Sequence, residues 1–230
     1  ALMVEKGLTG VHEAGTSLEM LQVYRDKIEA GEMPVRIYAM ADGMAEALDW
    51  LCENGPFADP SGRLQMRSVK LYQDGALGSR GAALLEPYSD DPGNVGLVVT
   101  SPETLETWCR RAYENGFAVA THAIGDAANR MVLEIYSRVL GGENDRRWRV
   151  EHAQILAPED LPRFAALDVI AAMQPVHCTS DMDWADERLG EDRLAGCYAW
   201  RSLLDSGAHL CFGTDFPVEK VDPLAGLFAA

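Results

Sequence analysis

Short apolar runs alternate with segments of helical periodicity along almost the whole chain. The runs are continuously apolar rather than alternating, which is typical of parallel strands covered on both faces. The pattern predicts strands over residues 7–14, 35–41, 64–72, 117–121, 148–152, 169–173 and 210–213. It predicts helices over residues 18–30, 44–53, 101–115, 126–140, 158–167 and 196–206, and a further helix from residue 223.

This repeated strand–helix order predicts an α/β fold, either a doubly wound sheet or a (β/α)8 TIM-type barrel that lacks one unit. No Gly-x-Gly-x-x-Gly fingerprint follows the first strand, which favours the barrel. We expect one barrel domain over residues 1–230. Residues 73–100 and 174–195 form the two expected long loops, and loops of that length are often functional.

Composition restricts the range of partners. The formal net charge is −16, which disfavours nucleic acid and anionic membrane surfaces, because both need clustered Lys and Arg. No apolar stretch approaches the roughly 18 residues that cross a bilayer. The five cysteines include no Cys-x-x-Cys pair, so we expect reduced thiols and a cytoplasmic protein. A small-molecule substrate and a second copy of the chain, in a homo-oligomer, remain as expected partners.

Polar residues recur where the predicted strands end. All of the histidines except His209 lie there or in the loop that follows a strand. The full set is His12, Glu13, Asp42, Lys70, Asp74, His122, Asp126, Glu151, His152, Gln174, His177 and Asp215. In a barrel these ends share the face where active sites are built.

Three of these residues suit a divalent metal. His122 and His152 lie one strand–helix unit apart, and Asp215 follows the last strand. Imidazole and carboxylate groups are good ligands for Zn²⁺ and similar ions. Such a metal lowers the pKa of a bound water to about 7, and a carboxylate beside it can take the proton. The sequence therefore predicts a hydrolytic metal site.

Each residue also has a structural interpretation. The two histidines could be packed in the core with satisfied nitrogens. Asp126 could cap the helix that it begins, and Asp74 could belong to a turn. His177 could be solvated in its loop. Lys70 could point inward and extend its amine to the mouth of the barrel.

Five ordered motifs resemble the amidohydrolase superfamily, in particular its amidohydrolase 3 family. They lie at residues 68–82 (SVKLYQDGALGSRGA), 121–126 (THAIGD), 150–154 (VEHAQ), 173–182 (MQPVHCTSDM) and 213–218 (GTDFPV). The resemblance implies a distorted (β/α)8 barrel that binds one or two divalent metals, usually Zn²⁺. It also implies hydrolysis of an amide, formamide or cyclic amide by metal-activated water.

The resemblance also implies site roles. Lys70 resembles a metal-bridging lysine that carries CO2 as a carbamate. His122, His152 and Asp215 resemble the other metal ligands, and Asp215 the proton shuttle as well. His177 is expected to face the substrate, and Arg80, in the loop 75–82, to line or cover the pocket.

One feature of the family is absent. The family has a His-x-His pair at the end of its first strand, whereas His12 stands alone. We therefore expect a piece of a longer enzyme, without the first strand, the last helix and a flanking β-sandwich. Two alternatives remain: a non-catalytic barrel that binds a small molecule at a degenerate metal site, or a metal-dependent esterase, phosphotriesterase or lactonase.

Overall fold

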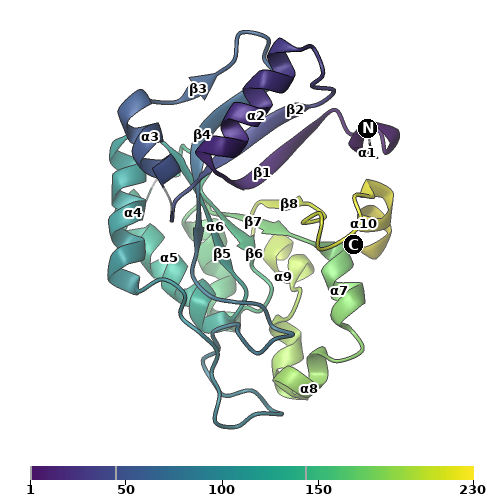
Figure 1. The fold of residues 1–230 in the computed structure, drawn as a ribbon. Helices are drawn as coiled ribbons and strands as arrows, with labels where there is room; N and C mark the ends of the chain where they lie inside the picture. The colour runs from purple at the N-terminus through teal and green to yellow at the C-terminus, as the bar shows by residue number, and fades with distance from the viewer. Residues whose placement is uncertain (1, 45, 143) are drawn as a thin grey trace. The chain divides into compact units, whose positions relative to one another are not determined.

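The computed structural model describes residues 2–44, 46–142 and 144–230. The chain divides into two compact units (Figure 1). Unit 1 comprises residues 1–71 and 110–120, and unit 2 comprises residues 72–109 and 121–230. We describe each unit by itself.

The strands follow one another in the sheet in chain order: β1 (Gly10–Thr16), β2 (Arg36–Asp42), β4 (Leu64–Tyr72), β5 (Ala118–Ala123), β6 (Arg149–His152), β7 (Ile170–Met173) and β8 (Leu210–Phe212). The short β3 (Phe57–Ala58) pairs with β4 outside that order. The pairs β1–β2, β2–β4, β6–β7 and β7–β8 are all parallel. Chain-order parallel strands joined by helices are the topology of a (β/α) barrel rather than of a doubly wound sheet, whose strand order reverses. The predicted α/β class is confirmed.

Unit 1 contains three parallel strands with helices between them. The strands are β1 (Gly10–Thr16), β2 (Arg36–Asp42) and β4 (Leu64–Tyr72, to Leu71 in this unit). The helices are α1 (Leu2–Glu5), α2 (Leu18–Glu29) and α3 (Glu46–Asn54), and the short β3 (Phe57–Ala58) is antiparallel to β4. Ser17 begins α2 by accepting a hydrogen bond from Met20 N at 3.2 Å, as an N-cap does. The predicted helix over residues 44–53 includes Ala45, which lies outside the described residues.

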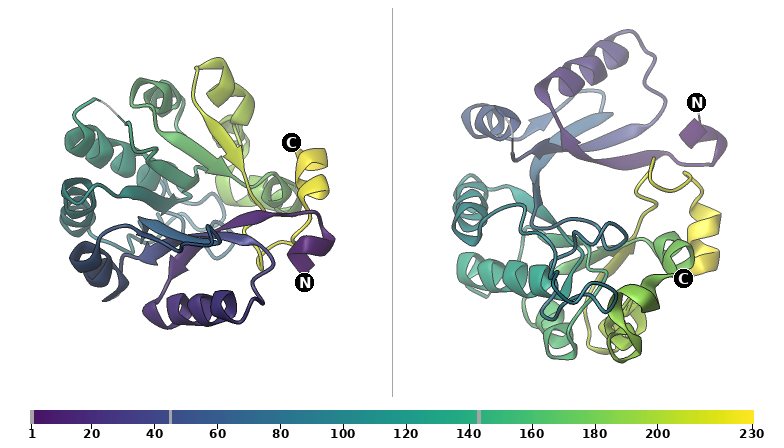
Figure 2. Two further views of the ribbon diagram at one scale, coloured as in Figure 1. Left: turned by 90° about the horizontal axis from the view of Figure 1, so that it is seen from above. Right: turned by 60° about the horizontal axis from the view of Figure 1, so that its bottom comes forward.

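Unit 2 contains the end of β5 (Ala118–Ala123) and the strands β6 (Arg149–His152), β7 (Ile170–Met173) and β8 (Leu210–Phe212). Its helices include α5 (Asp126–Leu140), α6 (Leu161–Ala166, after the 3-10 turn Pro158–Asp160), α9 (Trp200–Asp205) and α10 (Pro223–Ala229). Helices α5, α6 and α9 lie on the same side of these strands (Figure 2). Helix α4 (Pro102–Glu114) is divided between the two units.

The second predicted loop, residues 174–195, is largely helical, so that prediction was wrong. It contains α7 (Pro175–Asp181), α8 (Ala185–Leu189) and the 3-10 segment Glu191–Gly196. Each element is too short to show two turns of apolar periodicity, which is the signal that predicts a helix. Pro175 occupies the first turn of α7, where its missing N–H costs no hydrogen bond.

The first long loop, residues 73–100, is confirmed as a loop and is extensively bonded within unit 2. Asp126 Oδ1 accepts from Leu85 N at 2.8 Å, and Ala83 O accepts from Ala127 N at 3.1 Å. The guanidinium of Arg193 donates to the carbonyls of Glu86 and Pro87 at 3.0 and 2.9 Å. These bonds attach the loop to the start of α5 and to the segment after α8.

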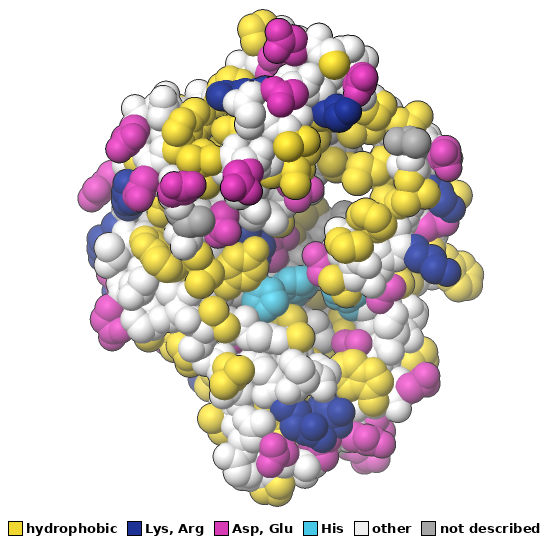
Figure 3. All heavy atoms as spheres, in the orientation of Figure 1, with side chains coloured by type: hydrophobic (Ala, Val, Ile, Leu, Met, Phe, Trp, Pro, Cys, Tyr) yellow, Lys and Arg dark blue, Asp and Glu magenta, His cyan; other side chains and the backbone are white. Residues whose placement is uncertain are grey.

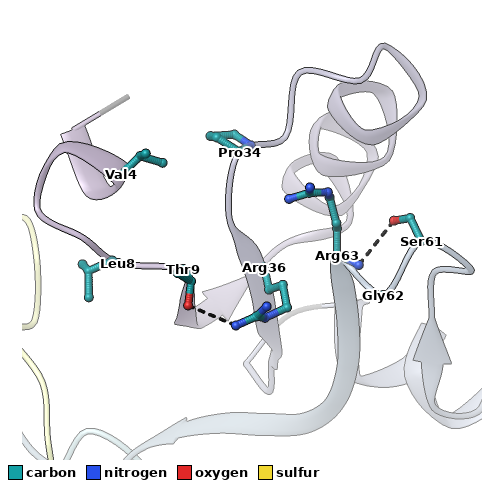
Figure 4. Close-up of a pocket in the computed structure, with 8 residues that line it drawn as sticks. All are labelled: Val4, Leu8, Thr9, Pro34, Arg36, Ser61, Gly62 and Arg63. Atoms are coloured by element: carbon teal, nitrogen blue, oxygen red, sulfur yellow. Dashed lines mark hydrogen bonds between the residues drawn. The ribbon is translucent and has the colours of Figure 1, made fainter.

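An open pocket of about 300 Å³ lies at the amino ends of the unit 1 strands (Figure 4). Arg36 and Arg63 line it, and Arg36 donates to Thr9 Oγ1 at 3.0 Å. The polar residues predicted to carry the chemistry follow the opposite, carboxyl ends of the strands. None of the residues that line this pocket belongs to the predicted site.

Across the described ranges, no helix combines the length and the apolar character that a bilayer crossing would require.

We predict that Gly125→Ala destabilises the protein. A Cβ at Gly125 would lie 1.9 Å from Ala83 O, so the loop or the start of α5 would have to move. Overpacking of this kind costs about 1–3 kcal/mol. Thermal unfolding of the full-length protein should show a lower Tm for this variant. Gly93→Ala, in the same loop with nothing within 4 Å of its Cβ, should leave Tm unchanged. Equal Tm values for the two variants would contradict this packing.

Candidate metal centre

Side chains that follow four successive strands of unit 2 gather in one place. His122 belongs to β5, His152 ends β6, His177 lies in α7 after β7, and Asp215 follows β8. Histidine side chains also cluster on the face drawn in Figure 3. One donor atom each from His152, His177 and Asp215 lies within 4.8 Å of the others. The rings of His122 and His152 are edge to face, with centroids 4.5 Å apart.

His152 is held in a defined tautomer by Gln174. The Gln174 amide nitrogen donates to Ala172 O at 3.1 Å, so its oxygen must face His152. That oxygen lies 2.7 Å from His152 Nδ1, which must therefore carry the proton. The other nitrogen, Nε2, keeps its lone pair. Hydrogen bonding of one ring nitrogen in this way orients a histidine for metal binding through the other.

Asp74 faces His122 from the loop after β4. Its carboxylate accepts backbone hydrogen bonds from Ala83, Ile124 and Gly125 at 2.8–2.9 Å, and Oδ1 lies 3.4 Å from His122 Nε2. Burial raises the pKa of Asp74 to about 6, although the three N–H donors oppose the shift. Asp74 thus joins the loop to the end of β5 directly beside His122. The turn interpretation of Asp74 describes only part of what it does.

His177 and Asp215 face each other across a gap. His177 Nε2 lies 4.0 Å from Asp215 Oδ2, which is too far for a hydrogen bond. Two ligands of one tetrahedral zinc ion lie roughly 3.4 Å apart when the bonds are about 2.0–2.2 Å. The observed separation is wider than that, so an oxygen atom in contact with both side chains would lie to one side of the line that joins them. His177 Nε2 is buried, and it has no hydrogen-bond partner within the described part of the chain.

The backbone at the centre is unusual. His152, Ala153 and Asp215 have φ values of 76°, 44° and 53°, in the left-handed region that side chains other than glycine's disfavour. Such conformations cost of order 1–3 kcal/mol each and persist only where the surroundings determine them. Residues of this kind cluster at functional sites, which supports a functional role for His152 and Asp215.

Two further predicted site residues make contacts within their own units. Lys70 belongs to unit 1, where it is buried at the end of β4 and its Nζ donates to Leu71 O at 3.3 Å. Arg80, in unit 2, forms a two-bond ion pair with Asp90 at 2.7 and 3.0 Å. Asp90 also bonds Arg188. The guanidinium of Arg80 therefore binds a carboxylate of its own loop.

Other polar strand-end residues have structural roles. Asp126 accepts from Leu85 N and from its neighbour Ala127 N, in line with a capping role. Glu151 pairs with Arg149 at 2.5 Å. His12 stacks on Tyr38 with centroids 4.7 Å apart. The exposed His209 lies 3.3 Å from Asp168.

Sequence reasoning missed a hydrogen-bonded group beside the centre. Asp181, at the end of α7, accepts from Gln154 Nε2 at 3.0 Å and from the Tyr198 hydroxyl. Burial raises the pKa of Asp181, and the Tyr198 bond opposes that shift. Burial and the bond to Asp181 raise the pKa of Tyr198. The spacing of His177 and Asp181, four residues apart, would have been a signal had the segment been predicted as a helix.

Comparison with known proteins identifies the family. The model of the amidohydrolase family matches residues 1–230, so the chain belongs to that family. The putative amidohydrolase YtcJ of Bacillus subtilis is 36% identical over 98% of this chain and 42% of its own length. The N-substituted formamide deformylase of Arthrobacter pascens is 25% identical over 97% of this chain and 42% of its own length.

Solved structures agree with this assignment. An uncharacterized metal-dependent hydrolase from Pyrococcus horikoshii OT3 superposes with a TM-score of 0.90 at 33% identity, over 99% of this chain and 45% of that one. The chain thus spans less than half the length of these relatives. The fold prediction, part of a TIM-type barrel of the metal-dependent hydrolase kind, is confirmed.

The residues of unit 2 fit a divalent cation. Imidazole and carboxylate donors converge within 4.8 Å, and the bond of Gln174 to Nδ1 of the histidine that ends β6 leaves Nε2 for the cation. This donor set suits Zn²⁺ and related ions. His152, His177 and Asp215 bring their donor atoms close enough together to hold the ion, and the ring of His122 lies beside that of His152.

We predict that Gln174→Ala weakens the binding of a divalent cation. Without the Gln174 oxygen, His152 can exchange tautomers and rotate, and loss of such a partner costs about 10–100-fold in metal affinity. Competition with a chromophoric chelator measures the change in Kd. Gln65→Ala, at an exposed position of β4, is the matched control and should keep the original Kd. If both variants bind the ion equally well, Gln174 does not orient a metal ligand.

Proposed function

We propose that the protein is a metal-dependent hydrolase that cleaves a carbon–nitrogen bond other than a peptide bond, in an amide, formamide or cyclic amide. The observation that carries this proposal is the convergence of His152, His177 and Asp215 in unit 2. Histidine and carboxylate donors at the carboxyl ends of parallel strands are the expected setting for barrel catalysis. The names of the Bacillus and Arthrobacter relatives favour an amide-type bond.

The residues of the site have different roles in the proposed mechanism. His122, His152 and Asp215 hold the cation, and Gln174 keeps Nε2 of His152 directed to it. A divalent ion bound there would polarise the scissile carbonyl and lower the pKa of the attacking water to about 7. The donor set supports Zn²⁺. In unit 1, Lys70 carrying CO2 as a carbamate would offer anionic oxygen donors, whereas an unmodified lysine is cationic and cannot bind a cation.

Asp215 and His177 act on the substrate side. The carboxylate of Asp215 is 40% exposed, so water and substrate can reach it. It takes the proton of the attacking water and returns it to the leaving nitrogen, as a general base and then a general acid. His177, 4.0 Å away, faces the same space and donates a hydrogen bond to the substrate carbonyl. Arg80 stabilises the covering loop through Asp90 and thereby shapes the pocket.

The oxidation state of the cysteines is relevant to the cellular compartment of the protein. Cys52, Cys109, Cys178, Cys197 and Cys211 are all free thiols. This supports the proposal of a reducing, cytoplasmic location.

We predict that Asp215→Asn lowers kcat by about 10²–10⁴-fold, since the amide can no longer accept the proton. The half-exposed side chain contributes little to packing, so Tm should change by only a few degrees. Steady-state kinetics on amide and formamide panels, with the full-length metal-loaded protein, measure the effect. Asp205→Asn removes an equal charge from an exposed ion pair and is the control. Normal turnover by Asp215→Asn would exclude this residue as the base.

We predict that removal of the metal abolishes hydrolysis reversibly. Dialysis against a strong chelator should reduce kcat to background, and Zn²⁺ should restore it. Elemental analysis by mass spectrometry should find about one or two metal ions per chain, as dinuclear and mononuclear sites require. Full activity in protein shown to be free of metal would contradict the proposed mechanism. If the protein hydrolysed only esters, the metal-dependent mechanism would stand but the proposed carbon–nitrogen bond class would be wrong.

A further inference from the structure

Helix α7 carries His177 and Asp181 on one face, four residues apart. It has only seven residues, and helices this short are not stable on their own in water. Its position must therefore be fixed by contacts with the rest of unit 2. Asp181 provides such a contact at the last residue of the helix, where its carboxylate accepts two side-chain hydrogen bonds.

The two donors to Asp181 come from segments next to the metal centre. Gln154, two residues after His152, donates through Nε2 at 3.0 Å. Tyr198, in the segment before α9, donates its hydroxyl to the same carboxylate oxygen. Tyr198 N in turn donates to Gln154 O at 2.7 Å, so the three residues form a closed ring of hydrogen bonds. Tyr198 also has a φ of 51°, a conformation that persists only where the surroundings determine it.

This ring connects the turn after His152 to the helix of His177. Gln174 contacts His152 from the beginning of α7, where it is the N-cap residue. The helix is thus attached at both ends: to His152 itself at its start, and to Gln154 at its end. His152 and His177 stack with an interplanar angle of 13° and centroids 6.0 Å apart.

We propose that Asp181 is a positioning residue that holds α7, through Gln154 and Tyr198, so that His177 faces His152 and Asp215. This inference rests on the proposed function, in which His177 meets the substrate. Asp181 itself touches neither the cation nor the substrate. Its effect is on the distance between His177 Nε2 and Asp215, which sets the width of the gap that receives the substrate oxygen.

The test compares Asp181→Ala, Asp181→Asn and Tyr198→Phe in the full-length, metal-loaded protein. Alanine removes both hydrogen bonds, and asparagine keeps an oxygen that can accept them. Phenylalanine removes one bond and keeps the ring. Asp183→Ala is the matched control, because Asp183 is exposed and lies two residues further along the chain.

We expect Asp181→Ala to lower kcat per folded molecule by about 10-fold or more. Losses of this size are usual when a residue that orients the ligands of a metal site is removed. Asp181→Asn should recover most of the loss, and Tyr198→Phe should show a smaller loss. The double variant Asp181→Ala/Tyr198→Phe should be no worse than Asp181→Ala, since both remove one network. Asp183→Ala should remain within twofold of the wild type. If Asp181→Ala does not fold, the asparagine and phenylalanine variants carry the comparison.

A crystal structure of the folded variant with the largest loss provides a readout that does not depend on activity. We expect His177 Nε2 to move away from Asp215 relative to the wild-type crystal structure, while His152 keeps its bond to Gln174. An unmoved His177, or a lower Tm with unchanged kcat and KM, would overturn the positioning role and leave a purely structural one. A wild-type protein that binds no metal would instead refute the proposed function, and the position of His177 in the variant would still decide this inference.

Discussion

The site depends on one constraint: parallel strands end along the same edge of their sheet. In unit 2 the strands β6, β7 and β8 pair in parallel, with Glu151 opposite Ala172 and Met173 opposite Phe212. Residues that follow the carboxyl ends of these strands are therefore brought close together. His152, His177 and Asp215 follow them, and this is why residues separated by more than 20 positions in the chain bring their donor atoms within 4.8 Å.

A second layer of hydrogen bonds turns this proximity into a defined arrangement. Gln174 fixes the tautomer of His152, Asp74 stands beside His122, and Asp181 holds the helix of His177. Asp74 and Asp181 accept hydrogen bonds from backbone or side-chain donors, and Gln174 donates one to Ala172 O. Left-handed backbone at His152 and Asp215 is tolerated within this framework. Orienting groups outside the ligands are what give a metal site its geometry.

The fold could be predicted from sequence because its strands are short, buried and separated by amphipathic helices. Nearly every predicted strand was found within a few residues of its expected bounds, as with β4 (Leu64–Tyr72). The strand-end rule predicted His122, His152 and Asp215 as ligands without coordinates, and the structure brings donor atoms of His152 and Asp215 together with one of His177. The short helices α7 and α8 were missed, because elements of seven and five residues show too little periodicity. The hydrogen-bonded group of Gln154, Asp181 and Tyr198 was not predicted either, because it depends on α7 being a helix.

Other features depend on tertiary contacts that no local pattern encodes. The pairing of Arg80 with Asp90 joins residues ten apart in an irregular loop, so the sequence did not reveal that Arg80 binds a carboxylate of its own loop. Asp74 resembled a turn residue because Gly75 follows it. Its bonds to Ile124 and Gly125, about fifty residues away, become visible only when the loop is folded against β5.

The most direct test of the account is a crystal structure of the full-length protein grown with Zn²⁺, with anomalous scattering recorded at the zinc edge. The account predicts an anomalous peak within about 2.0–2.2 Å of His152 Nε2 and of an Asp215 carboxylate oxygen. A structure with no peak there, or with zinc bound only at another place on the chain, would contradict it.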